Sequence, residues 1–266
     1  MNAKLLTLTA LSVFALAACG GGGSDSPVQT TQSTKQDNNV KPQQSQQQSQ
    51  KPQQQQQQQQ VKLDVEYEIY RNGKEINNDD AAEDKYPQNR LNVMNLDGRN
   101  LVIIPDGVQS KGILRLEDST MKRWVGGADL SYARYGVISY LKENKDYIFV
   151  QGVESQETKK WDMPNTNGVI YKGNAVAYHI SDGALDKGTV TFTANFKNKN
   201  MSGSINLKQF GTLSFDNIKI DGNDFEGGSG ARKIEGDFYG AKAAEMAGEF
   251  EAKDKGIIGV FGAKKQ

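Results

Sequence analysis

The single cysteine of the chain stands where its chemistry is easiest to assign. Cys19 closes the tetrapeptide Leu16-Ala17-Ala18-Cys19, which follows an apolar stretch that begins just after Lys4. A short positive segment, an apolar segment and small residues at a cleavage site are typical of a secretory signal, and a cysteine at this place is typical of a bacterial lipobox. We therefore expect cleavage after residue 18 and acylation of Cys19, where each buried acyl methylene contributes about 0.8 kcal/mol to anchoring. The alternative is an ordinary secretory signal with an incidental cysteine.

The residues after the cysteine predict a tether at the outer membrane. Gly20 follows Cys19 where an aspartate could stand, and by resemblance to enterobacterial sorting rules this directs a lipoprotein to the outer membrane. The stretch Lys41–Gln60 holds 14 Gln among its 20 residues, and so polar a segment cannot offset the entropy of ordering. We expect residues 1–18 to be the signal peptide, and residues 19–60 to be the lipidated cysteine with a disordered Gln-rich tether.

The single histidine limits haem chemistry to one residue. His179 stands beside Tyr178, near the end of a predicted strand. A haem iron takes axial ligands such as histidine, so haem at His179 is one hypothesis, and a strand-end histidine without a ligand is the other. One cysteine and one histidine exclude a cysteine-based zinc site and any site that needs two imidazoles. We expect no metal and no cofactor, with haem as the alternative.

The predicted loop Glu154–Met163 carries the strongest candidate for a partner-binding site. Lys159, Lys160 and Trp161 stand together in it. An aromatic side chain flanked by charges is typical of a hot spot between two proteins, where a few residues supply most of the binding energy. The alternative is that Trp161 folds over the rim of the β structure as a cap.

Two further groups admit both a functional and a structural interpretation. Trp124 precedes two glycines near an expected domain junction, where packing between the domains is its expected role. An acidic group earlier in the chain suggests calcium, but it lacks the glycine-centred twelve-residue pattern of an EF-hand, so a solvated loop is expected. Its residues are Asp79, Asp80, Glu83 and Asp84.

The charge balance argues against nucleic acid as a partner, and no motif supports catalysis. The chain carries 32 basic and 32 acidic residues, of which four basic and two acidic residues stand among the first sixty. Residues 61–266 therefore carry 28 basic and 30 acidic residues, which gives them a net charge of −2. Nucleic-acid binding needs a basic surplus. The glycine clusters at 126–127 and 227–230 lack the lysine and the strand-to-helix context of a phosphate loop. The chain is expected not to be an enzyme.

Residues 61–266 are predicted to fold almost entirely as β structure. Val61–Ile69 alternates apolar and polar residues strictly, which predicts a strand with one wet face, and Asn72-Gly73 after it indicates a hairpin. Short strands at regular spacing, separated by turns, favour an antiparallel sandwich or barrel. Further strands are expected at 91–94, 100–104, 112–117, 132–141, 147–152, 168–179, 188–196, 201–209, 211–218, 233–239, 245–251 and 256–261, with a single helical turn at 241–247.

Two features of these strands bear on the kind of barrel. In Gly188–Phe196 threonines alternate with Val190, Phe192 and Ala194, so one face of the strand is polar. A barrel inside a membrane would need an apolar outer band, and this pattern predicts a soluble one. Glycines inside strands, such as Gly173 and Gly259, are expected where a corner or a bulky neighbour needs the space.

The order of several motifs in the second half resembles a known family. The segments that carry the resemblance are Tyr132–Val137, Tyr147–Gly152, Met163–Val176, Val190–Phe196, Met201–Ile205, Ile234–Phe250 and Gly259–Lys264. In order and spacing they resemble the C-terminal barrel of the transferrin-binding protein B-like surface lipoproteins, which include factor H-binding protein and the haemophilin-type haem-binding proteins. The resemblance covers residues 126–266, and residues 61–125 in general style.

The resemblance implies a fold and a route to the cell surface. The implied fold is all-β, with a small N-terminal handle β domain at 61–125 followed by an eight-stranded antiparallel barrel at 126–266. The resemblance also implies export by a dedicated outer-membrane translocator that acts on the barrel. The protein would then be lipid-anchored in the outer membrane, facing the extracellular side, and would bind a partner rather than catalyse a reaction.

The resemblance further implies a host protein as the partner. Transferrin-binding proteins are similar to two handle-and-barrel lobes in tandem, whereas this chain has room for one lobe, and single-lobe relatives bind complement regulators or haem. The expected function is therefore the recruitment of a complement component from serum, factor H or factor I, for immune evasion. Haem capture for iron acquisition, binding of a transferrin-type iron protein, and a coat protein with no fixed ligand are the alternatives.

Overall fold

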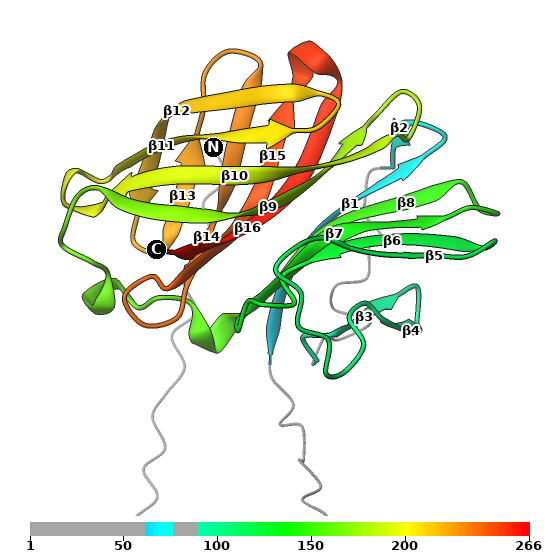
Figure 1. Cartoon of the computed structure of the whole chain (residues 1–266), viewed down its shortest axis with the longest axis horizontal. Coiled ribbons are helices and arrows are strands. Elements are labelled where there is room, and N and C mark those ends of the chain that lie inside the picture. Colours follow the sequence, from blue (N-terminus) through cyan, green and yellow to red (C-terminus); the bar gives the residue numbers. More distant parts are fainter. Residues whose placement is uncertain (1–61, 77–89) are drawn as a thin grey trace, which may run out of the picture. The chain divides into compact units, whose positions relative to one another are not determined.

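The computed structural model describes residues 62–76 and 90–266, which belong to one compact unit, Gln55–Gln266. Within these ranges every regular element is a β-strand or a single turn of 3₁₀-helix (Figure 1). None of the helices in this part of the chain has the length and apolar character to cross a membrane. The predicted signal peptide, Cys19, the Gln-rich tether and the acidic loop at 79–84 lie outside the described residues. The all-β prediction is confirmed.

The N-terminal part of the unit is a six-stranded sheet with a separate hairpin. The sheet has the strand order β2-β1-β8-β7-β6-β5, and the hairpin pairs β3 with β4 (Figure 1). The strands are β1 (Leu63–Arg71), β2 (Lys74–Glu75), β3 (Val93–Leu96), β4 (Arg99–Val102), β5 (Leu114–Glu117), β6 (Met121–Gly126), β7 (Ala133–Tyr140) and β8 (Lys145–Val153).

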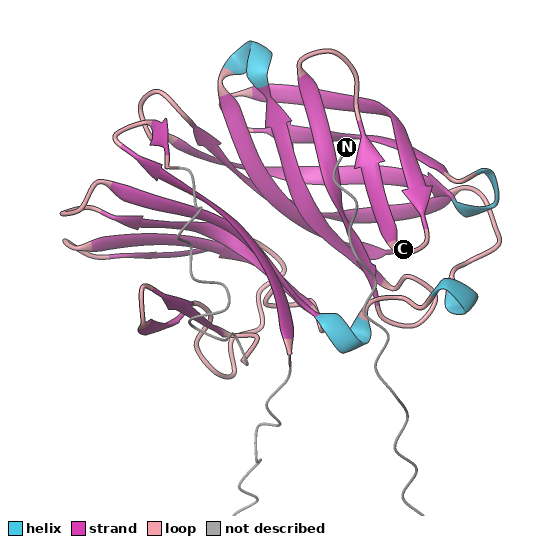
Figure 2. Ribbon diagram, turned by 180° about the vertical axis from the view of Figure 1, so that it is seen from behind, coloured by secondary structure: helices cyan, strands magenta, loops and turns pink. Residues whose placement is uncertain are grey.

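The C-terminal part is a closed barrel of eight antiparallel strands, in which β9 pairs with both β10 and β16. The curved barrel stands beside the flatter sheet in Figure 2. Its strands are β9 (Val169–His179), β10 (Leu185–Asn195), β11 (Asn200–Leu207), β12 (Gly211–Asp221), β13 (Asp224–Gly227), β14 (Arg232–Tyr239), β15 (Glu245–Ala252) and β16 (Ile257–Lys265). The 3₁₀-helices are η1 (Glu154–Gln156), η2 (Lys160–Asp162), η3 (Phe196–Asn198) and η4 (Lys253–Lys255).

The barrel begins later than the predicted boundary between residues 125 and 126. That boundary falls at the end of β6, and both β7 and β8 belong to the N-terminal sheet. The reason is that β1 pairs with β8 along its whole length, from Leu63 opposite Val153 to Arg71 opposite Lys145. A pairing between strands so far apart in sequence cannot be predicted from the local sequence pattern. The predicted limits of the handle, 61–125, and of the barrel, 126–266, are therefore corrected to a division between β8 and β9.

Two smaller predictions are also corrected. The helical turn expected at 241–247 is absent from this described segment, where a turn leads directly into β15 at Glu245. The barrel also needs β13, which was not predicted because it is only four residues long and follows a turn closely. Short strands of this kind gain their stability from neighbours on both sides, here β12 and β14.

The barrel interior is filled by large apolar side chains from every strand. In β10 the residues Val190, Phe192 and Ala194 are buried, whereas Thr189 and Thr191 are exposed, as the alternation predicts. The ring centroids of Phe192 and Phe261 lie 5.4 Å apart. Each such side chain contributes about 1.5–3 kcal/mol through removal from water. The polar outer face predicted for this strand is confirmed.

The predicted reason for glycines inside strands is confirmed at two positions. A Cβ atom on Gly173 would lie 2.0 Å from the carbonyl oxygen of Gly262 on the neighbouring strand. At Gly259 a Cβ atom would lie 2.4 Å from Cζ of the Phe250 ring. Because both distances are far below van der Waals contact, any side chain at these positions would force strands or a core ring apart.

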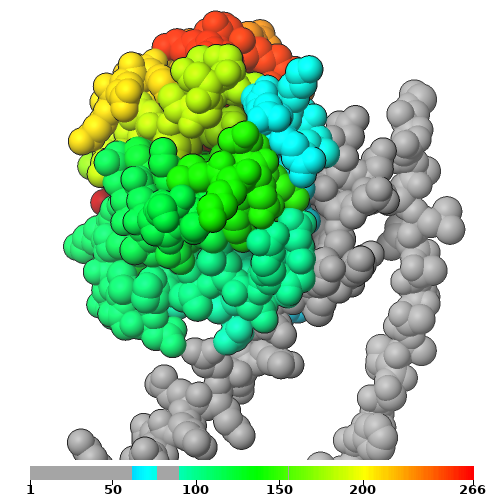
Figure 3. Space-filling model, turned by 90° about the vertical axis from the view of Figure 1, so that its right-hand side faces the viewer, coloured from blue at the N-terminus to red at the C-terminus, as the bar shows by residue number. Residues whose placement is uncertain are grey.

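The sheet and the barrel share a hydrophobic cluster of buried residues. Trp124 and Tyr70 from the sheet pack with Val176 and Tyr178 from the barrel, and the rings of Tyr70 and Tyr178 are 5.4 Å apart. Trp124 is only 7% exposed, which confirms its predicted role in packing between the two parts. Figure 3 shows the surface above this cluster, where the cyan N-terminal residues of the sheet lie against yellow-green residues of the barrel.

A buried carboxylate ties the loop before β7 to the barrel. Glu245 is 3% exposed at the start of β15. Its Oε1 accepts a hydrogen bond from the backbone nitrogen of Ser131 at 2.8 Å, and its Oε2 accepts one from the backbone nitrogen of Tyr132 at 3.0 Å. Lys264 lies 3.8 Å from the same carboxylate. The charge is therefore held by two backbone donors and one cation.

Replacing this carboxylate should destabilise the folded chain strongly. We expect Glu245→Ala to lower the free energy of unfolding by about 2–4 kcal/mol, because two partly buried N–H groups lose their acceptor. Urea denaturation followed by circular dichroism measures the change. Glu226→Ala on β13 serves as the control because Glu226 is exposed. Equal denaturation midpoints for the two variants would show that Glu245 does not support the loop.

Candidate functional site

The connection between β8 and β9 projects the most exposed aromatic side chain in the described part of the chain. Trp161 lies in η2 and is 86% exposed, whereas the next most exposed large apolar side chain, Val102, is 47% exposed. This excludes the interpretation of Trp161 as a cap packed over the barrel rim. An indole left almost wholly in water contributes little to folding, so packing does not account for the position of Trp161.

Backbone contacts hold this connection against the turn between β14 and β15. Thr158 donates from its backbone nitrogen to the carbonyl of Phe238 and from its hydroxyl to the carbonyl of Gly240, both at 2.8 Å. Beyond Trp161, Asp162 Oδ2 accepts a hydrogen bond from the backbone nitrogen of Lys242 at 2.8 Å. The indole is therefore presented from a loop fixed on both sides, which lowers the entropy lost when a partner binds.

Several lysines belong to the loop that carries the exposed indole or to the segments in contact with it. Lys159 and Lys160 are both exposed and form no salt bridge with another described residue. Lys242 is exposed beside Asp162, and Lys265 donates to the carbonyl of Lys242. We call the group Lys159, Lys160, Trp161, Lys242 and Lys265 the Trp161 surface. The structure brings the three predicted residues together with two lysines that lie far away in sequence.

The contribution of Lys242 and Lys265 was missed by sequence reasoning. Nothing in the local sequence relates the loop after β8 to the turn before β15 or to the C-terminal end of β16. The three segments meet because the closed barrel places β14, β15 and β16 side by side. Clusters of lysines near an exposed aromatic residue therefore become visible only once the strand order is known.

His179 lies at the end of β9, next to polar side chains of the turn that follows. Its Nδ1 is 2.7 Å from Asp182 Oδ1 and 3.2 Å from the hydroxyl of Ser181. Its ring lies 5.8 Å from that of Phe210. Four cavities formed by the described residues are not lined by His179. Haem binding at this residue stays a prediction that its surroundings do not favour.

A second group missed by sequence reasoning is a set of carboxylates between the sheet and the barrel. The polar face of β1, predicted to be wet, turns toward β14 and β15, and Glu68 lines a groove of about 280 Å³ with Glu235 and Glu249. Burial, aided by the neighbouring Glu235 and Glu68, raises the pKa of Glu249 to about 8. Burial also raises the pKa of Glu68. The alternation of β1 showed which residues share a face, but not what covers that face.

A second pair of neighbouring carboxylates lies on β13 and β14 of the barrel. Asp224 of β13 and Asp237 of β14 are directly opposite each other. Burial, together with a hydrogen bond to Asp224, raises the pKa of Asp237 to about 8. No group of three or more possible metal ligands exists among the residues described.

Comparison with protein families finds a match for the barrel. A family model described as the C-lobe and N-lobe beta barrels of Tf-binding protein B matches residues 163–265. This range starts just before β9 and ends with β16, so it coincides with the closed barrel.

Curated relatives extend the similarity into the N-terminal sheet. An uncharacterized protein of Haemophilus influenzae is 30% identical over 198 residues, which cover 66% of this chain and 66% of that protein. Transferrin-binding protein B of Neisseria meningitidis serogroup B is 27% identical over 210 residues, which cover 64% of this chain and 34% of that protein. The chain thus matches about a third of the length of the meningococcal protein.

Solved structures show the same fold. The isotype 1 transferrin-binding protein B from serogroup B Neisseria meningitidis superposes with a TM-score of 0.52 at 21% identity, covering 76% of this chain and 43% of that one. A mutant of transferrin-binding protein B from Haemophilus parasuis Hp5 gives a TM-score of 0.51 at 20% identity, covering 76% and 45%. The named relatives are binding proteins, which confirms the expectation that the chain is not an enzyme. The matched model shows that the barrel of this chain belongs to the barrel family of transferrin-binding protein B, and the chain as a whole is similar to proteins of that name in sequence and fold.

Proposed function

We propose that the chain binds a host protein and that the Trp161 surface supplies the central contact. The observation that carries this proposal is the indole of Trp161, 86% exposed on a loop that is hydrogen-bonded on both sides. Tryptophan is the residue type most enriched at binding hot spots. The four lysines of the Trp161 surface favour a partner surface rich in carboxylates, since complementary charge speeds encounter and sets orientation.

The names of the relatives make an iron-carrying serum protein of the transferrin class the first partner to test. Three curated relatives are named transferrin-binding protein B. The resemblance described in the sequence analysis gives a second candidate to test. That candidate is a complement component, factor H or factor I, as expected from the sequence.

Capture from host serum separates these candidates. The full-length chain is immobilised, incubated with serum and washed, and the retained proteins are identified by mass spectrometry. Enrichment of transferrin or of a complement component supports the corresponding partner. The Trp161→Ala variant on a parallel support is the control for capture through the Trp161 surface. Equal retention of every serum protein on the wild-type chain and on a support without protein would overturn the proposal.

We also propose that the chain is anchored by lipid on the extracellular side of the outer membrane. Support comes from Cys19 at the end of the Leu16–Cys19 motif and from the family to which the barrel belongs.

The anchor has a direct test. Cys19→Ala should move the protein from the membrane fraction to the soluble fraction and abolish labelling by a radioactive fatty acid, because the acyl chains supply most of the membrane affinity. Protease digestion of intact cells, with and without permeabilisation, reports the side of the membrane. Unchanged membrane association of Cys19→Ala would contradict the anchor.

A further inference from the structure

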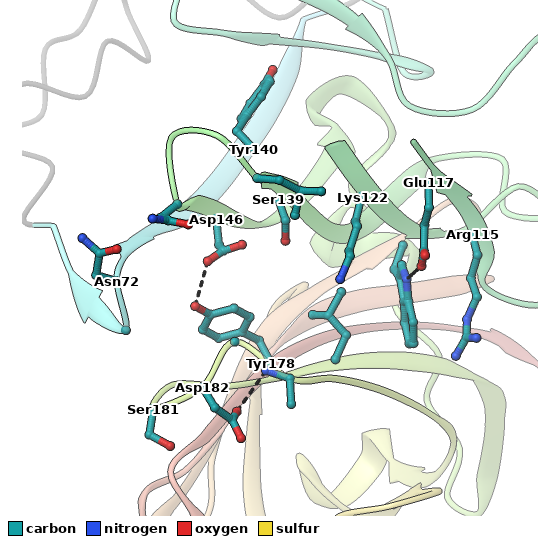
Figure 4. A pocket seen from close by; sticks show the side chains of 17 residues that line it. Asn72, Arg115, Glu117, Lys122, Ser139, Tyr140, Asp146, Tyr178, Ser181 and Asp182 are labelled. Carbon is teal, nitrogen blue, oxygen red and sulfur yellow. Dashed lines mark hydrogen bonds between the residues drawn. The ribbon is translucent and has the colours of Figure 1, made fainter. Parts of the chain in front are cut away.

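A polar cavity of about 830 Å³ lies between the N-terminal sheet and the turn that joins β9 to β10. Its floor is formed by β5, β6, β7 and β8, and its opposite wall includes Tyr178, Asp182 and Leu185 (Figure 4). No residue of the Trp161 surface lines it. Cavities of 300–1,000 Å³ are the size that proteins use for small organic molecules.

The register of the sheet arranges the floor as a row of polar side chains. Glu117 is opposite Lys122, Lys122 is opposite Ser139, and Ser139 is opposite Asp146. Residues directly opposite on antiparallel strands point to the same face, so four strands each contribute one polar group to the cavity. Figure 4 shows Lys122, Ser139 and Asp146 pointing into the same space, while Tyr140 points away from it.

Both carboxylates of this row already accept a hydrogen bond, whereas two donors are unused. The Tyr178 hydroxyl donates to Asp146 Oδ2 at 2.8 Å, and Trp124 Nε1 donates to Glu117 Oε1 at 2.6 Å. Ser139 is 93% buried, since its exposure is 7% (100 − 7 = 93). The part of the chain that the structure describes offers its hydroxyl no partner, and the same holds for the Lys122 ammonium. Both groups line the cavity, and Lys122 is exposed, so both donors are free to bind a ligand that brings an acceptor.

The other residues that line the cavity restrict the kind of ligand that can supply this acceptor. Asp146 and Asp182 would repel a bare inorganic anion, but their remaining lone pairs can accept hydrogen bonds from hydroxyl groups. The amides of Asn72 and Asn144 and the apolar side chain of Leu185 complete the lining. The cavity therefore suits a molecule that carries one carboxylate together with several hydroxyl groups.

We propose that this cavity binds an acidic sugar, whose carboxylate is held by the Lys122 ammonium and the Ser139 hydroxyl and whose hydroxyl groups meet the carboxylates and amides around them. The Arg115 guanidinium, stacked 3.7 Å above the Trp124 ring at one end of the cavity, adds a second positive charge near the ligand. This site goes beyond the proposed binding of a host protein, because it uses none of the residues of the Trp161 surface.

The chain carries its own reporter for the test. It has two tryptophans, and Trp161→Phe leaves Trp124 in the cavity wall as the only one. In the full-length Trp161→Phe chain, N-acetylneuraminic acid is titrated by calorimetry while Trp124 emission is recorded. We expect saturable binding with a change in emission, binding at least tenfold weaker for neutral galactose, and no saturation by inorganic phosphate.

Variants of the two donors complete the test. Lys122→Met should weaken binding of N-acetylneuraminic acid roughly tenfold or more, because a charge-assisted hydrogen bond is lost, and Ser139→Ala should weaken it by a smaller factor. Lys208→Met removes an exposed lysine outside the cavity and should change nothing. Absence of saturable heat, equal binding of phosphate, or unchanged affinity in folded Lys122→Met would each overturn the proposal. Serum capture by the wild-type chain is unaffected by any of these outcomes.

Discussion

Trp161→Ala should weaken binding of the host protein by roughly 30- to 1,000-fold, or about 2–4 kcal/mol. The indole is 86% exposed in the free chain and gives its apolar surface to the partner alone. Its loop is held by Thr158 and Asp162, so the variant loses the contact without disturbing the loop. Surface plasmon resonance with the protein captured from serum measures the dissociation constant.

A matched apolar truncation elsewhere separates this effect from general loss of surface. Val102→Ala shortens another exposed apolar side chain, on β4, and should leave the affinity unchanged. Thermal unfolding of Trp161→Ala should match that of the wild-type chain, because an exposed side chain contributes little to stability. A Trp161→Ala variant that binds as tightly as Val102→Ala would show that the partner contacts another surface.

Glu249→Gln should stabilise the folded chain at pH 8.5 and have little effect at pH 4.5. The ordinary pKa of this carboxyl is 4.5, and burial beside Glu235 and Glu68 raises it to about 8 in the folded chain. The folded state therefore binds more protons than the unfolded state between about pH 4.5 and pH 8. Stability falls as pH rises through that window, and the full penalty is present above pH 8. The neutral glutamine removes the penalty.

The expected size of the effect is about 1–3 kcal/mol at pH 8.5. One pKa unit corresponds to about 1.4 kcal/mol, but the groove is open to water, which reduces the gain. Asp237→Asn should behave in the same direction, since burial beside Asp224 raises its pKa to about 8 as well.

Urea denaturation at several pH values from 4.5 to 8.5 measures this dependence. Asp216→Asn on β12 removes an exposed carboxylate and is the control. Two results together would contradict this prediction. The stability of the wild-type chain would be flat or would rise from pH 5 to pH 8.5, and Glu249→Gln would be no more stable than Asp216→Asn. The carboxylates would then not be paired at the interface.

Much of the fold follows from patterns between close neighbours in sequence. The alternation of β10, the hairpin at Asn72-Gly73 and the strands from residue 132 onward except β13 were predicted, because each depends on side chains two residues apart or on a tight turn. The same local reasoning singled out Trp161 among Lys159 and Lys160, since residue types and their order suffice to suggest a hot spot.

Other features depend on contacts between residues far apart in sequence. The pairing of Leu63 with Val153 assigns β7 and β8 to the N-terminal sheet and moves the start of the barrel to β9. The same pairing turns the predicted wet face of β1 toward the barrel, where Glu68 meets Glu249. Periodicity shows which residues share a face, but only packing shows what that face meets.

The sequence by itself determined the β character and the identity of the candidate residues, and it carries the prediction of a lipobox at Cys19, because these depend on composition and local order. The tertiary structure alone decided that Trp161 is exposed and that Ser139 is buried beside Lys122 in a cavity. Exposure and burial depend on which strands come together when the chain closes. Strand pairing over tens of residues is set by the packing of the whole fold, and no local pattern encodes it.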